Sequence, residues 1–106
     1  MAEIEKELEQ INHFQIVAEI FKQLSDPTRI RIFWLLCHCE ECVTNISALL
    51  EMSSSAVSHH LRPLKTSGLI ISHRVGKEVY YRASDTEQSQ LLHIMIEKVM
   101  AIACPN

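Results

Sequence analysis

Three cysteines lie close together in the segment Cys37-His38-Cys39-Glu40-Glu41-Cys42, with a C-x-C-x2-C spacing. Thiolates are the ligands that soft ions prefer, among them As(III), Sb(III), Cd(II) and Pb(II). The segment falls near the end of an expected helix, in which successive residues are turned by about 100°, so Cys37 and Cys39 would point to opposite sides. Binding of one ion by all three sulfurs therefore requires the end of that helix to unwind.

A structural role is the alternative for part of this cluster. Cys37 continues an apolar stripe that includes Phe33 and Trp34, and on its own it would be a core residue. Cys39 and Cys42 do not extend that stripe. The cluster as a whole therefore favours a thiol-based sensor over inert cysteines.

A fourth cysteine and a histidine pair lie further along the chain. Cys104, near the C-terminus, is a further candidate ligand or redox thiol. His93 and Glu97 lie one turn apart on an expected helix, a spacing more typical of a solvated hydrogen bond than of a metal site. In a cytosolic protein, four cysteines indicate free thiols, metal ligands or redox groups rather than a disulfide framework.

A second set of side chains has the chemistry of nucleic-acid recognition. Between residues 54 and 66, Val57, Leu61 and Leu64 mark the buried face of an expected helix. Serine, histidine and arginine on the opposite face can donate hydrogen bonds to phosphates and to base edges in a major groove. The residues expected there are Ser54, Ser55, Ser58, His59 and Arg62, and Arg74 and Lys77 are expected to reach the flanking backbone or minor groove. Taken singly, these serines could be a helix cap and these histidines a surface pair.

The charge of the chain is unevenly distributed. The formal net charge is -3 at pH 7, but residues 53–82 carry five basic side chains against Glu78 alone, a local balance of +4. An acidic chain with one basic region is compatible with DNA binding of modest non-specific affinity. No apolar run is long enough to span a bilayer, and the acidic N-terminus lacks the layout of a signal peptide. We therefore expect a cytoplasmic protein with no membrane association.

Helices are expected over most of the chain, which has only two glycines. Asp26 and Pro27 are typical of a helix start, because Asp caps the first turn and Pro suits the first position. Small Ser47 lies where two short helices would cross, and Gly68 would end the second of them. The pattern predicts helices over residues 4–11, 13–24, 27–37, 45–50 and 54–66, and a long final helix that Asp85 caps and that ends near residue 103.

The period of the apolar residues changes between the last two helices. Residues 69–74 and 78–82 are rich in Ile, Val and Tyr, and Gly76 lies between them, which predicts a β-hairpin. Val75 is a poor residue for a left-handed turn position, so the hairpin loop is expected to be longer than two residues, with Gly76 at positive φ. Two short crossing helices followed by a hairpin are typical of a winged helix-turn-helix.

Three motifs together resemble the ArsR/SmtB family of transcriptional repressors. They are Ser25-Asp26-Pro27-Thr28-Arg29, Ser55-Ala56-Val57-Ser58-His59-His60-Leu61 and Gly76-Lys77-Glu78-Val79-Tyr80-Tyr81-Arg82. The resemblance, which covers about residues 13–84, implies a homodimer that sits on operator DNA and leaves it when an inducer binds. It also implies pairing of the first and last helices across a two-fold axis, with which the apolar final helix agrees. At Glu51 many family members have Gly, so this turn is expected to be strained or differently shaped.

The resemblance implies that the chain is a single, mainly α domain with a β-hairpin wing. The expected parts of the domain 1–106 are dimerisation helices at 1–24 and 85–106, a helix-turn-helix at 44–67 and a wing at 69–83.

The same resemblance narrows the set of ions that are expected as inducers. Cys37, Cys39 and Cys42 match the trio of arsenic-responsive members, whereas cadmium-responsive members usually add cysteines from an N-terminal arm that this chain lacks. The zinc site that other members carry on the last helix is absent here. Some members instead sense oxidants or reactive sulfur, and Cys37 or Cys39 with Cys104 has that placement. A regulator that binds DNA constitutively, or through a partner, is the third hypothesis.

An enzyme is the alternative from another class. The chain has no HExxH, nucleophile elbow, phosphate-binding loop or CxxC pair. A Cys–His hydrolase would need a substrate cleft, for which a cysteine in a short helix leaves no room. We therefore expect a DNA-binding protein without catalytic activity.

Overall fold

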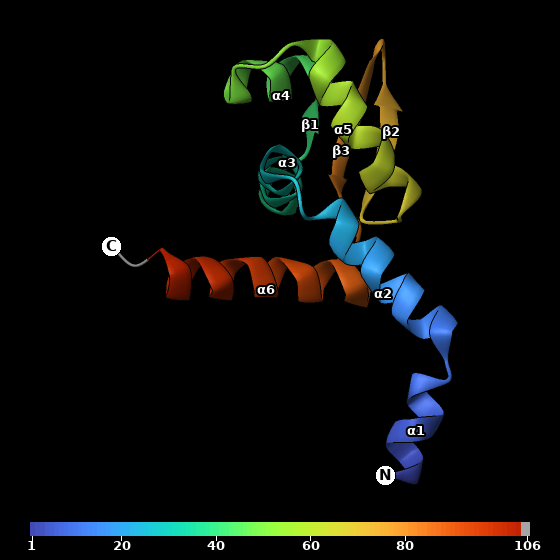
Figure 1. Cartoon of the computed structure of the whole chain (residues 1–106). Helices are drawn as coiled ribbons and strands as arrows, with labels where there is room; N and C mark the ends of the chain where they lie inside the picture. Colours follow the sequence, from blue (N-terminus) through green and yellow to red (C-terminus); the bar gives the residue numbers. More distant parts are fainter. Residues whose placement is uncertain (105–106) are drawn as a thin grey trace.

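The computed structural model describes residues 1–104, which form six helices and a small antiparallel sheet (Figure 1). Helices α3, α4 and α5, together with the sheet, make the body, and α6 crosses beneath it. The elements are α1 (Ala2–Leu8), α2 (Ile11–Gln23), α3 (Pro27–His38), β1 (Glu41–Cys42), α4 (Val43–Leu50), α5 (Ser54–Thr66), β2 (Ile70–Val75), β3 (Glu78–Ala83) and α6 (Glu87–Ala103).

Three helices, α3, α5 and α6, begin with a residue whose side chain caps the first turn. The Asp26 carboxylate accepts a hydrogen bond from the Arg29 amide at 2.9 Å, as predicted for the start of α3. Ser53 accepts from the Ala56 amide at 3.1 Å and begins α5. The prediction that Asp85 caps α6 is wrong, because the hydroxyl of Thr86 accepts from the Ser89 amide.

The carboxylate of Asp85 is engaged elsewhere. It accepts a hydrogen bond from the Arg82 guanidinium at 3.1 Å and so is turned away from the first turn of α6.

The hairpin is tighter than the sequence pattern predicts. Val75 pairs with Glu78, which leaves a loop of only Gly76 and Lys77. Gly76 has φ +62°, the value that a type II′ turn requires at its first central position. Val75 therefore ends the strand and needs no left-handed conformation, which is why the prediction of a longer loop is wrong.

The sheet contains a strand that the sequence analysis does not predict. Its order is β1-β3-β2, and the two residues of β1 pair with Tyr81 and Tyr80 of β3. This strand connects the end of α3 to the start of α4. Its position makes the cysteine segment an edge of the wing.

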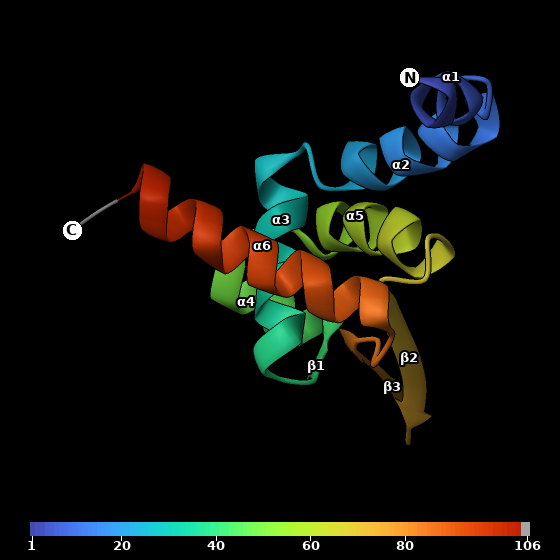
Figure 2. The same ribbon diagram turned by 90° about the horizontal axis from the view of Figure 1, so that it is seen from below.

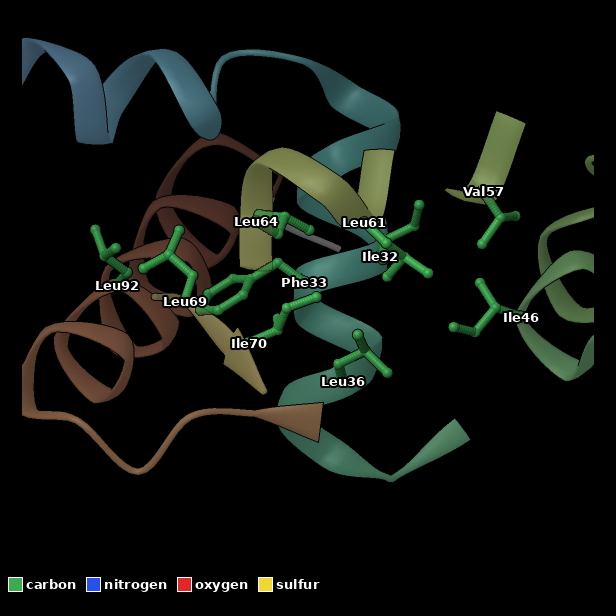
Figure 3. Close-up of a cluster of buried hydrophobic side chains, with 10 residues drawn as sticks. All are labelled: Ile32, Phe33, Leu36, Ile46, Val57, Leu61, Leu64, Leu69, Ile70 and Leu92. Atoms are coloured by element: carbon green, nitrogen blue, oxygen red, sulfur yellow. The ribbon is translucent and has the colours of Figure 1, made fainter. Parts of the chain in front are cut away.

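The core is formed by the helix-turn-helix, α3 and the base of the wing (Figure 3). Residues from five different elements meet there, and their burial is nearly complete. They are Ile32, Phe33, Leu36, Ile46, Val57, Leu61, Leu64, Leu69, Ile70 and Leu92. This set fixes α5 against α3 and leaves the opposite face of α5 in solvent.

The N-terminal helices and α6 lie at the periphery, as the two views of the ribbon show (Figure 2). Helix α1 has no buried residue, and the only buried residue of α2 is Gln23. Apolar side chains on these helices are exposed in the single chain, among them Phe14, Phe21, Leu91 and Val99. None of the helices within residues 1–104 has the length and apolar character to cross a membrane.

Candidate nucleic-acid interface and cysteine site

The two short helices cross at Ser47, as its small side chain predicts. Its hydroxyl donates to the Val43 carbonyl at 2.8 Å and lies 3.3 Å from the hydroxyl of Ser54 at the start of α5. A larger side chain here would separate α4 from α5. The crossing sets the direction in which α5 projects from the body.

The outer face of α5 carries the polar side chains that the sequence analysis assigned to it. Ser54, Ser55, Ser58, His59 and Arg62 are all exposed. Ser54 also bonds to Ser47, so part of its hydrogen-bonding capacity is used inside the helix-turn-helix.

His60 turns toward the body instead. Its side chain is 16% exposed, and its Nδ1 lies 3.8 Å from the Asp26 carboxylate. It therefore packs α5 against the start of α3 and is not part of the outer face.

The basic side chains near this face are free of acidic partners. Arg62, Arg74 and Lys77 are exposed, and among the described residues no carboxylate oxygen lies within 4.0 Å of their charged groups. The hairpin tip and the start of α5 both lie at the end of the molecule away from α6 (Figure 1). Unpaired cations on two projecting elements are suited to an extended polyanion.

The three clustered cysteines lie in consecutive parts of the structure: the last turn of α3, the residue after that helix, and strand β1. Cys37 is half-buried in the last turn of α3, and Cys39 is exposed and follows the helix in an extended conformation, φ -154° and ψ 165°. Cys42 is 4% exposed, in β1 and at the start of α4. The helix thus ends before Cys39 already, and of the three thiols only that of Cys42 is buried.

The thiols of Cys37 and Cys39 are poorly ionised, since both pKa values are raised. Burial, and then the nearby Glu97 carboxylate, raise the pKa of Cys37 to about 11. Burial and the Glu41 carboxylate raise the pKa of Cys39. Thiol donors fit a soft ion, but an ion that binds here must displace their protons.

The structure brings together two imidazoles and a carboxylate, not the three thiols. Within residues 1–104, the one cluster whose potential ligand atoms all lie within 4.8 Å of one another is His38, His93 and Glu97. The i, i+4 spacing of the last two is visible in the sequence. Their approach to His38, which is 55 residues away from His93, is a property of the packing of α3 against α6.

The fourth cysteine lies apart from the cluster. Cys104 is exposed at the C-terminal end of α6, seven residues beyond Glu97. At a rise of about 1.5 Å per residue, it is about 10 Å further along the helix than the carboxylate that faces Cys37. A disulfide joins Cα atoms about 6 Å apart, so Cys104 and the cluster are not poised to form one within a chain.

Comparison with known proteins identifies the family of the chain. The family model described as bacterial regulatory protein, arsR family, matches residues 26–72. The transcriptional repressor SmtB homolog of Synechocystis sp. is 37% identical over 89 residues, which are 84% of this chain and 67% of that protein. The cadmium resistance transcriptional regulatory protein CadC homolog of Staphylococcus aureus is 42% identical over 77 residues, 72% of this chain and 64% of that protein. The chain thus spans about two thirds of the length of these relatives.

A solved structure gives the same result for the fold. The homodimeric winged helix-turn-helix DNA-binding domain from Mycobacterium bovis, a possible ArsR-family transcriptional regulator, superposes with a TM-score of 0.77 at 28% identity. That match covers 92% of this chain and 88% of the other. The fold is therefore that of winged-helix DNA-binding proteins. The chain belongs to the ArsR/SmtB family of bacterial regulatory proteins, which regulate transcription and are not enzymes.

Proposed function

We propose that this chain is a homodimeric transcriptional repressor that binds operator DNA through α5 and the wing and releases it when a soft ion binds the cysteine segment. The observation that carries the proposal is the position of that segment. It is paired with strand β3 of the wing on one side and continues directly into α4 on the other. A change at the cysteines therefore acts on both DNA-reading elements at once.

The DNA contacts follow from the exposed faces. Ser55, Ser58, His59 and Arg62 enter the major groove with α5, and Arg74 and Lys77 hold the flanking backbone from the wing. Ser54, which also bonds to Ser47, fixes the start of the helix at the groove. The free cations supply the affinity that does not depend on sequence.

A second copy of the chain is the partner that covers the apolar helices. On α6, residues Leu91, Met95 and Ile102 lie on one side, and all three are exposed in the single chain. Apolar residues of α1 and α2 are exposed as well, including Ile4 and Phe14. Pairing of 1–24 and 85–106 across a two-fold axis removes this surface from water, in keeping with the homodimeric structure from Mycobacterium bovis.

Release of the DNA depends on Cys42, whose thiol must become accessible to the ion. Cys37 and Cys39 can approach a soft ion from the end of α3, but Cys42 is buried and its backbone pairs with Tyr80. Binding of a third thiolate therefore exchanges the β1–β3 pairing for a metal–sulfur bond. We infer that this exchange shifts the wing and the start of α4 away from the DNA-binding arrangement.

The identity of the ion is the finer part of the proposal. The C-x-C-x2-C spacing favours As(III) or Sb(III), and the similarity to a cadmium resistance regulator favours Cd(II) or Pb(II). Three thiolates suit the pyramidal coordination of As(III), whereas Cd(II) completes its shell with a further donor or with water.

The experiment is an anaerobic titration of the reduced protein with arsenite and with Cd(II), followed by thiol counting and by release of operator DNA. We expect about three thiols per chain to be consumed, and we expect Cys39→Ser and Cys42→Ser to bind DNA but not to release it. Cys104→Ser is the matched control, which should respond normally. Normal release in both cluster variants would place the sensor elsewhere.

A redox switch is the second candidate. It rests on the exposure of Cys39 and Cys104, which makes both accessible to oxidants or polysulfides. The raised pKa of Cys39 and the distance along α6 make an intrachain disulfide the less favoured form. Mass spectrometry after polysulfide treatment distinguishes the two candidates, because only the redox switch gives a covalent adduct or a Cys104 crosslink.

A further inference from the structure

The cluster of His38, His93 and Glu97 lies where the end of α3 meets α6. The Nε2 atoms of the two histidines are 3.2 Å apart, and Glu97 Oε1 lies 2.8 Å from the Nε2 of His93 and 3.4 Å from that of His38. Three atoms that can each donate a lone pair thus converge on one point.

Hydrogen bonds alone satisfy this triangle poorly. If both Nε2 atoms carry protons and donate to the carboxylate, two N–H groups face each other at 3.2 Å. If one Nε2 is unprotonated, it can accept a hydrogen bond from the other histidine, but it can no longer donate one to the Glu97 carboxylate. A cation at the centre would accept a lone pair from all three atoms at once.

The dimensions match a small metal site. Zinc–nitrogen and zinc–oxygen bonds of about 2.0–2.1 Å in a tetrahedral site place neighbouring ligand atoms about 3.3 Å apart. Two of the three separations here, 3.2 and 3.4 Å, are close to that spacing, and the third, at 2.8 Å, is a hydrogen bond that would lengthen on binding.

The rings are also held in place. The ring of His38 packs on Trp34 with the centroids 4.2 Å apart, and it meets the ring of His93 edge-on at 4.9 Å. A hollow of about 330 Å³, lined in part by Cys37, His38 and His93, opens beside the cluster. It leaves room for water as a fourth ligand.

We propose that His38, His93 and Glu97 form a second metal site, independent of the thiols, for a borderline divalent ion such as Zn(II). Imidazole and carboxylate ligands select such ions, whereas the cysteine segment selects softer ones. The site joins α3 to α6, so its ion ties the helix that carries Cys37 to the helix proposed for dimerisation.

The site remains accessible in the proposed dimer. At about 100° per residue, His93 and Glu97 lie on the side of α6 opposite to Leu91, Met95 and Ile102. His38 and Glu97 are 43% and 47% exposed. Dimerisation through the apolar stripe therefore leaves the cluster in solvent.

The test uses the full chain with Cys37→Ser and Cys39→Ser, which removes the accessible thiols of the cluster and leaves the buried Cys42 in place. Zn(II) binding is measured by calorimetry, and Co(II) absorption reports nitrogen and oxygen ligands without a thiolate charge-transfer band. We expect one ion per chain. His38→Ala, His93→Ala and Glu97→Gln should each weaken binding by more than the roughly 10–100-fold that loss of an outer-shell partner costs.

His13→Ala is the matched control, because His13 pairs with Glu7 at 2.9 Å but has no third ligand within reach in residues 1–104. Its affinity for Zn(II) should equal that of the parent. Zn(II) should also raise the melting temperature of the parent but not that of Glu97→Gln, since the ion links two helices. Unchanged Zn(II) affinity in the three cluster variants would overturn the proposal. It would leave the soft-ion sensor untouched, because Cys37 and Cys39 are replaced in this background and the variants test only the histidine and carboxylate ligands.

Discussion

At the scale of single residues, the chemistry of this protein depends on groups whose charges are unsatisfied or suppressed. Arg62, Arg74 and Lys77 have no carboxylate oxygen within 4.0 Å among residues 1–104, while the thiols of Cys37 and Cys39 are held in their neutral form. The cations are therefore available for the contacts to DNA phosphates that we propose. The thiols become ionised only when an ion takes the place of their protons.

The suppressed ionisation gives a pH dependence that separates the candidate ions. Because the pKa values of Cys37 (about 11) and Cys39 lie above the ordinary thiol value, both groups are protonated from pH 6 to 8. Cd(II) must displace both protons, so these two thiols by themselves should make its affinity rise by about 100-fold for each pH unit in this range. Arsenous acid brings its own hydroxyls, which leave as water with the thiol protons, and its affinity should stay nearly constant. Competition titrations at pH 6, 7 and 8 measure both, and a flat Cd(II) profile would exclude these two thiols as ligands.

The free cations give a prediction about DNA affinity. Arg62→Ala and Lys77→Ala should each remove about one phosphate contact, which weakens binding and lowers the magnitude of the salt slope by about 1. Fluorescence anisotropy at several salt concentrations measures both effects. Lys6→Ala is the control of equal charge, because Lys6 belongs to α1, which lies at the opposite end of the molecule from the hairpin tip (Figure 1). Unchanged binding in both variants would remove α5 and the wing from the interface.

At the scale of elements, the turn between α4 and α5 is the strained part of the helix-turn-helix. Glu51 ends α4 in the left-handed conformation, with φ 54° and ψ 49°, and no other non-glycine residue of the described chain has positive φ. This is the departure that the family resemblance anticipated. The left-handed region costs a residue with a Cβ atom about 1–2 kcal/mol.

Replacement of Glu51 tests whether its left-handed conformation destabilises the fold. Glu51→Gly should stabilise the fold by about 1 kcal/mol, because glycine adopts this conformation without the Cβ penalty although it adds freedom to the unfolded chain. Thermal unfolding at a fixed protein concentration measures the change. Gly68→Ala is the opposite control, since φ is +80° there and an added Cβ meets nothing within 4 Å. An unstable Glu51→Gly protein would show that the glutamate side chain has a structural role.

At the scale of the whole molecule, the single chain leaves apolar helix faces uncovered. Its core holds the helix-turn-helix and the base of the wing, while α1, α2 and much of α6 have apolar faces in solvent. A charge on this surface should therefore prevent pairing without unfolding the chain. Leu91 and Val99 are 57% and 58% exposed, so Leu91→Glu and Val99→Glu remove no core contact.

We expect these variants to have the mass of one 12.2 kDa chain in light scattering, half that of the parent. Their operator affinity should fall, because one protomer reaches only one half-site. Gln90→Glu adds the same charge on the other side of α6 and should stay dimeric. A parent protein that is already monomeric would contradict the dimer itself.

Local patterns in the sequence determined the element types, because capping and apolar periodicity act within a few residues. The Asp26 cap, the Ser47 crossing and the buried face of α5 were predictable on these grounds, as was the family resemblance. The type II′ turn at Gly76 and the cap of α6 were not, since alternatives one residue apart look alike in sequence.

Tertiary structure alone decided what the cysteine and histidine clusters can do. Strand β1 exists only because β3 lies beside it, and within the trio Cys42, in that strand, is buried whereas Cys39 is exposed. His38 meets His93 and Glu97 only because α3 packs on α6. Both are contacts between segments far apart in the chain, and spacing along a sequence contains no information about distances that folding alone creates.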